Sequence, residues 1–73
     1  MIAKYEFCNE FCKLLQKTEQ HKDLTQLVYT MGDDGDEWVM AIWKTRSGLY
    51  GKPIDVTADS ETAMIKDILR GIE

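Results

Sequence analysis

Four carboxylates stand within five residues of the chain, at Asp33, Asp34, Asp36 and Glu37. Calcium prefers carboxylate oxygens, so this segment is a candidate cation loop. The calcium loop of EF-hands, however, spaces its acidic residues alternately and ends on a distant glutamate, and this segment does neither. Clustered carboxylates can also imitate nucleic-acid phosphates and occupy a basic groove on a partner, or they can simply solvate a hairpin tip. We predict no metal site here and keep residues 33–37 as a candidate surface for a protein partner.

Two thiols and one imidazole, from Cys8, Cys12 and His21, would together supply three zinc ligands. The cysteines, however, share a helical stripe with Phe7 and Phe11, where a cysteine packs as a small hydrophobic side chain. Three residues separate the two thiols, whereas a redox motif has two between them. We therefore predict buried, reduced thiols, with no metal and no cofactor.

The sequence contains none of the usual groups that support catalysis. The one histidine lies in a polar connector, and there is neither a glycine-rich phosphate loop nor a serine elbow. A core this small also leaves little room for a pocket of a few hundred cubic ångströms. We predict that the protein is not an enzyme and has no catalytic residues.

The two tryptophans, Trp38 and Trp43, are five positions apart and therefore point to opposite faces of a strand. Two short helices cover one face of a small sheet, so one tryptophan is left on the outer face. The sequence leaves open which face the helices cover, and we take Trp43 as the outer tryptophan. There it is either covered by the long stems of Lys44, Arg46 or Lys52, or it binds a partner, because exposed tryptophan is enriched at interface hot spots. If it binds a partner, a small polar residue in its place should abolish binding and leave the fold intact.

The elements that position these residues follow from the spacing of apolar residues. Apolar residues recur every three or four positions over residues 4–17, which predicts an amphipathic helix. Residues 24–31 and 37–44 are rich in strand formers, and Asp34-Gly35 between them predicts a tight hairpin turn. A third strand is predicted over residues 49–57, either at a sheet edge or starting after Pro53, because proline lacks the N–H that a ladder needs.

A second helix closes the chain. We expect its cap at Asp59 or Ser60, an apolar stripe that includes Met64 and Ile68, and its end at Gly71. The order α-β-β-β-α predicts an α+β fold, in which two helices pack on one face of a three-stranded antiparallel meander sheet. Residues 1–73 should form a single domain.

This order of elements, over nearly the whole chain, is similar to that of double-stranded RNA-binding domains, which recognise RNA by shape and phosphate contacts. The resemblance implies two contact regions: lysines that open the last helix, and the turn between the first two strands. Here the helix opens with Ser60-Glu61-Thr62-Ala63-Met64-Ile65-Lys66, and the turn is Asp33-Asp34-Gly35-Asp36. Neither region has the charge that phosphate contacts require, so no binding residue is carried over.

The net charge of −4, from nine basic and thirteen acidic side chains, disfavours nucleic acids and anionic membranes as partners. A local patch of Lys44, Arg46 and Lys52 is the alternative site for a nucleic acid. No apolar run approaches the roughly 18 residues that span a bilayer, and no secretory leader is visible. Two cysteines do not make a disulfide framework, so we expect a cytoplasmic protein.

These features favour a small, non-catalytic protein-interaction module, and a regulator or inhibitor of a larger protein would fit them. Its predicted binding surface is the outer sheet face around Trp43, with the acidic turn at one end. The predicted partner-binding residues are Trp43, Lys44, Arg46, Asp33, Asp34, Asp36 and Glu37. The alternatives are the nucleic-acid-binding domain and a homodimer that pairs two outer faces or two sheet edges about a two-fold axis.

Overall fold

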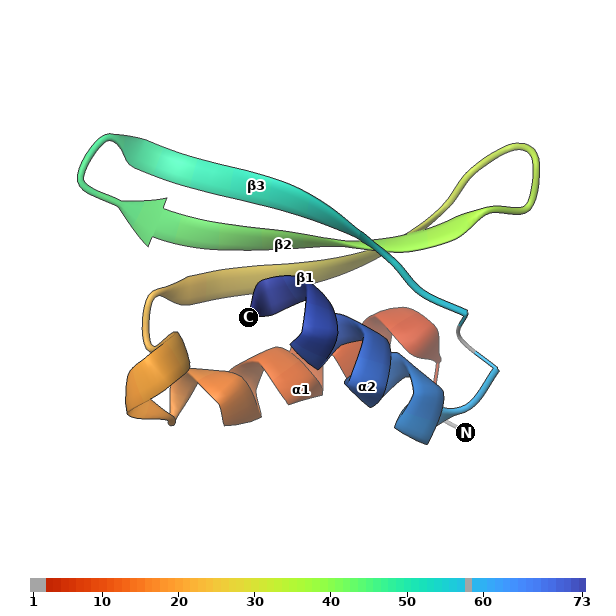
Figure 1. The fold of residues 1–73 in the computed structure, drawn as a ribbon, viewed down its shortest axis with the longest axis horizontal. Coiled ribbons are helices and arrows are strands. Elements are labelled where there is room, and N and C mark those ends of the chain that lie inside the picture. Colours follow the sequence, from red (N-terminus) through yellow and green to blue (C-terminus); the bar gives the residue numbers. More distant parts are fainter. Residues whose placement is uncertain (1–2, 58) are drawn as a thin grey trace.

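A computed structural model describes residues 3–57 and 59–73 and shows two layers, a sheet and a pair of helices (Figure 1). The elements in chain order are α1 (Lys4–Gln16), the one-turn 3₁₀ helix η1 (Glu19–His21), β1 (Leu24–Met31), β2 (Glu37–Thr45), β3 (Gly48–Asp55) and α2 (Glu61–Ile72). The strands form an antiparallel sheet in the order β1-β2-β3, and both helices lie on the same side of it. The predicted α-β-β-β-α order and α+β class are confirmed.

The hairpin turns have the local chemistry that a meander needs. In the first turn Gly35 adopts a positive φ of 89°, and the Gly32 N–H donates to the Asp36 carbonyl oxygen at 2.8 Å. The second turn ends on Gly48, where φ is 123°. L-residues with a Cβ rarely adopt either conformation, so both glycines fix the positions at which the chain reverses.

Both outer strands of the sheet carry a feature that limits their free edge. Pro53 lies within β3 opposite Met40, and β3 is an edge strand as predicted. At the other edge, the Gln16 side-chain amide donates to the carbonyl oxygens of Leu24 and Thr25, at 2.8 and 3.3 Å. α1 therefore uses a side chain at its end to satisfy two acceptors of β1.

α2 begins at Ser60, whose hydroxyl accepts a hydrogen bond from the Ala63 N–H at 3.1 Å. This resolves the predicted cap in favour of Ser60. The prediction that Gly71 ends the helix is wrong, because Gly71 lies inside α2. A Cβ at Gly71 would lie only 2.5 Å from the nearest carbon of Ile54, so glycine is the residue that allows α2 to approach β3 so closely.

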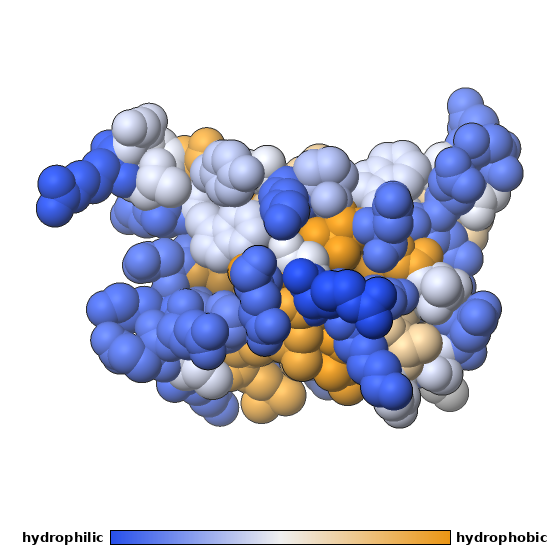
Figure 2. Space-filling model, viewed as in Figure 1, coloured by the Kyte–Doolittle hydropathy of each residue, from blue (hydrophilic) through white to orange (hydrophobic). Residues whose placement is uncertain are grey.

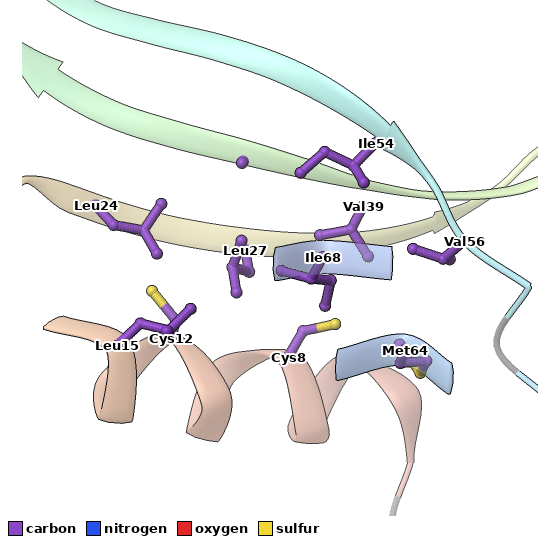
Figure 3. Close-up of a cluster of buried hydrophobic side chains, with 11 residues drawn as sticks. Cys8, Cys12, Leu15, Leu24, Leu27, Val39, Ile54, Val56, Met64 and Ile68 are labelled. Carbon is purple, nitrogen blue, oxygen red and sulfur yellow. The ribbon is translucent and has the colours of Figure 1, made fainter. Parts of the chain in front are cut away.

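The core lies between the layers and receives side chains from both helices and all three strands (Figure 3). Its buried members are Cys8, Cys12, Leu15, Leu24, Leu27, Val39, Ala41, Ile54, Val56, Met64 and Ile68. The predicted burial of both thiols is confirmed, since Cys8 is 0% and Cys12 is 4% exposed. Within the described part of the chain, neither helix is long and apolar enough to cross a membrane.

Candidate functional site

The face of the sheet that points away from the helices carries an apolar row along β2. Val39 and Ala41 are fully buried and point to the helices. Successive side chains of a strand alternate between its two faces, so Trp38, Met40 and Ile42 point to the other side. Strand register places β1 and β3 residues beside them. We define the outer face as Gln26, Val28, Thr30, Trp38, Met40, Ile42, Lys44, Leu49, Gly51, Pro53 and Asp55.

The apolar row extends across all three strands. Met40 lies between Val28 on β1 and Pro53 on β3, and Val28 is 42% exposed. A Cβ at Gly51 would lie 3.3 Å from the Met40 sulfur, so the Met40 side chain lies across this glycine. Among residues 3–57 and 59–73, no element covers this face, because both helices lie on the opposite side (Figure 1).

The prediction that Trp43 is the outer tryptophan is wrong. Trp43 has the same parity as Val39 and Ala41, packs against the core, and lies with its ring centroid 5.7 Å from that of Tyr50. The outer tryptophan is Trp38 instead. The physical reason is that Val39 and Ala41, which are fully buried against the helices, share the parity of Trp43, so this parity faces the core.

The four acidic residues of the first turn do not stay together. Asp33, Asp34 and Asp36 are exposed at the tip, where the Asp34 carboxylate accepts a hydrogen bond from the Asp36 N–H at 3.1 Å. Glu37, by contrast, is the first residue of β2 and points to the helix side. Only three of the four predicted carboxylates therefore remain as a solvated acidic tip.

Glu37 instead forms a cluster with Lys4 of α1 and Tyr29 of β1. The Lys4 ammonium donates to the Glu37 carboxylate at 2.9 Å, the Tyr29 hydroxyl donates to the same oxygen at 2.5 Å, and Lys4 lies 5.5 Å from the centre of the Tyr29 ring. This cluster was not predicted from the sequence. The available signal was the parity of Glu37, which matches that of Val39 and Ala41.

The pKa shifts of Lys4, Tyr29 and Glu37 fit a structural role, in which the three side chains hold α1 against the sheet; the cluster is called the clasp below. Hydrogen bonds from Tyr29 and then Lys4 lower the pKa of Glu37, while the hydrogen bond with Glu37 raises the pKa of Lys4. Burial, followed by the hydrogen bond with Glu37, raises the pKa of Tyr29. Each shift moves the pKa further from neutral pH, whereas a general acid or base needs a pKa near the working pH. The cluster ties α1 to the base of the first hairpin.

The three cations of the predicted basic patch are also separated. Lys44 is exposed on the outer face, and Arg46 is exposed in the second turn. Lys52 pairs with the buried Ala41 and therefore lies on the helix side, where its ammonium donates to the Gly71 carbonyl oxygen at 2.7 Å. The sheet itself stands between Lys44 and Lys52.

Cys8 and Cys12 lie in surroundings that disfavour the charged form of a thiol. Burial, and then the neighbouring Cys12 thiolate, raises the pKa of Cys8 to about 11, and burial raises the pKa of Cys12. Both shifts disfavour the thiolate that metal binding and nucleophilic attack require. Within residues 3–57 and 59–73, no three His, Cys, Asp or Glu side chains are grouped so that they could hold a metal ion.

A groove of about 280 Å³ runs between α1 and the free edge of β1. Its lining residues are Asn9, Cys12, Lys13, Gln16, Thr25 and Gln26. Lys13 is the one charged side chain among these residues, and Gln16 already bonds the β1 backbone. The groove therefore brings together no acid–base pair and leaves the outer face as the stronger candidate site.

No protein-family model, curated protein or solved structure matches this chain. The structure has the α-β-β-β-α order that is similar to that of double-stranded RNA-binding domains. The two regions implied as RNA contacts are, in the structure, the acidic tip and the start of α2, where Glu61 lies in the first turn and Lys66 in the second.

Proposed function

We propose that this chain is a non-catalytic protein-interaction module that binds a protein partner through the outer face of its sheet. The observation that carries the proposal is the apolar row Trp38, Met40 and Ile42 on the face that neither helix covers. Aromatic residues and methionine are enriched at the centre of protein interfaces, and tryptophan is a frequent hot spot. A regulator or inhibitor that acts by occupying a surface on a larger protein is one form of such a module.

The continuity of the patch supports the proposal. Single exposed apolar residues are ordinary on soluble proteins, whereas contiguous patches rimmed by polar residues mark interaction sites. Val28, at 42% exposure, extends the row onto β1, and Leu49, at 72% exposure, extends it onto β3. The rim of the same face carries polar and charged groups, including Gln26, Lys44 and Asp55.

The nucleic-acid alternative has weaker support. It required Lys44, Arg46 and Lys52 to act together, and Lys52 lies on the other side of the sheet with its ammonium bonded to α2. Phosphate binding depends on several cations that reach one backbone. The two cations that remain near the second turn are opposed by a net charge of −4.

A photo-crosslinking amino acid placed at Ile42 tests the proposal in lysate of the native host. We expect Ile42 to form a crosslink to a protein, either a second copy or another chain, because it lies at the centre of the outer face. The matched control is Leu14, which is 60% exposed on α1, on the helix side of the molecule. Crosslinks from Leu14 without any from Ile42, or none from either, would refute the proposal.

The two tryptophans offer a second, matched comparison. Trp38→Ser should remove the Ile42 crosslink and leave the circular dichroism spectrum unchanged, because Trp38 lies on the uncovered face. Trp43→Ser should lower the free energy of unfolding instead, because Trp43 packs against the core. If Trp38→Ser leaves crosslinking unchanged in a folded protein, the tryptophan is not part of the binding surface.

A further inference from the structure

The outer face has opposite charges at its two ends. Asp55 lies beside Trp38 at one end, and Lys44 lies beside Leu49 at the other. The six residue steps from position 38 to position 44 separate these ends by about 20 Å, so the two charges cannot reach each other within one chain. The adjacent turns continue the pattern, since one carries the acidic tip and the other carries Arg46.

Both end charges are available for a partner. Lys44 and Asp55 are exposed, and neither side chain has a hydrogen bond or ion pair with any other residue in the ranges 3–57 and 59–73. Figure 2 shows hydrophilic side chains projecting at both ends of the sheet, where the two turns lie in Figure 1. A partner that matches this face therefore needs an apolar centre, a basic end and an acidic end.

A second copy of this chain meets that description when it is turned end for end. We infer that the partner is a second copy of this chain, and this inference rests on the function proposed above. The two copies pack outer face to outer face. The two-fold axis that relates them lies in the interface and runs across the strands. This axis places Lys44 of each copy over Trp38 of the other and next to Asp55, which is paired with that tryptophan, so the two copies form two identical ion pairs. A two-fold axis along the strands would instead place like charges together.

The same axis also matches the apolar residues. The outer residues of β2 from Trp38 to Lys44 are centred on position 41, so Met40 of one copy lies over Ile42 of the other. Trp38 then lies over the apolar stem and ammonium of Lys44, a favourable arrangement for a cation and an indole ring. The flexible Met40 side chain can adapt to the surface that it meets.

The size of the outer face indicates the expected dissociation constant of the dimer. Three strands of about eight residues present a surface of about 26 by 14 Å. Two such faces together have a planar area of about 730 Å². This is below the roughly 1,000 Å² of a stable specific interface and is in the range of weak, transient ones. The dimer should therefore dissociate on dilution, with a Kd on the order of micromolar.

Sedimentation equilibrium over a wide range of protein concentration tests the inference. We expect a concentration-dependent dimer that salt weakens. Lys44→Glu and Asp55→Lys should each raise Kd about tenfold, because each change places like charges at both ends of the interface. A mixture of these two variants should dimerise as the unmodified protein does, because both ends then carry opposite charges. Lys66→Glu, on the exposed side of α2, is the matched control and should change nothing.

The results separate this inference from the proposed function. A monomer at millimolar concentration overturns the inference, as does a dimer that is indifferent to both charge reversals. A monomer whose Ile42 position crosslinks to a different protein overturns the inference and leaves the proposed function in place. A monomer with no crosslink overturns both. Recovery of dimerisation in the mixture supports the inference, and it also shows that both variants are folded.

Discussion

Replacing Gly71 with alanine should destabilise this protein, although alanine is the better helix former. In an exposed helix, this change gains up to about 1 kcal/mol. Here the added methyl group would lie 2.5, 2.7 and 2.9 Å from three side-chain carbons of Ile54, whereas carbon atoms prefer about 3.5–4.0 Å. Overpacking of this kind costs about 1–3 kcal/mol. We therefore expect a net loss of about 1–2 kcal/mol in the free energy of unfolding.

The assay is thermal and urea unfolding followed by circular dichroism. For a domain of this size, 1 kcal/mol corresponds to about 4–8 °C, so Tm should fall by about 5–15 °C. The control is the same Gly71→Ala change in an Ile54→Ala background, which lacks all three clashing carbons. There the change should stabilise the protein by up to about 1 kcal/mol.

Ile54→Ala alone lowers the free energy of unfolding by about 2–5 kcal/mol. Ile54→Ala and the double variant with Gly71→Ala are therefore compared in a stabilising osmolyte such as TMAO. The coupling between the two sites is the quantity of interest, since it isolates the contact between α2 and β3. If Gly71→Ala stabilises the original protein, or has the same effect in both backgrounds, the close approach of α2 to β3 is refuted.

Two further predictions concern titratable groups. Because the pKa of Glu37 is lowered in the folded state, its contribution to stability is present above the ordinary glutamate pKa of about 4.3 and is lost as pH falls through the lowered value. Urea midpoints measured from pH 6 to pH 2.5 should therefore fall less steeply for Glu37→Gln than for the original protein, and equal slopes would contradict the clasp. Because the pKa of Cys8 is about 11, only about one thiol in a thousand is ionised at pH 8, so native Cys8 and Cys12 should react with a disulfide reagent far more slowly than in urea. Equal rates would contradict their burial.

Local sequence was sufficient to predict the two α-helices and the three strands, although it did not predict η1. The predicted first strand, residues 24–31, coincides with β1, and the glycine at position 35 has the positive φ that its turn requires. These features depend on neighbours in the chain, so a single sequence contains them. The burial of Cys8 and Cys12 followed from helical periodicity in the same way.

The features that sequence failed to predict depend on contacts between layers. Both parities of β2 are apolar, so periodicity alone could not decide whether Trp38 or Trp43 is covered. Two residues favoured the correct assignment: the small Ala41 on the buried parity and the charged Lys44 on the exposed parity. The charged Glu37 lies on the buried parity and favoured the wrong assignment. The role of Glu37 could not be predicted from the neighbouring aspartates, because the two residues that bind Glu37 come from two other elements.

The two edges of the sheet also matter for aggregation. The six residues from Trp38 to Trp43 form an uncharged, strand-prone segment of the kind that stacks into steric zippers. In the fold this segment is the central strand, with β1 on one side and β3 on the other. β1 has two edge carbonyls occupied by Gln16, and β3 lacks one N–H donor at Pro53, so neither edge is a good template for another chain. The strand best suited to nucleate a fibril is the one that the folded protein never presents at an edge.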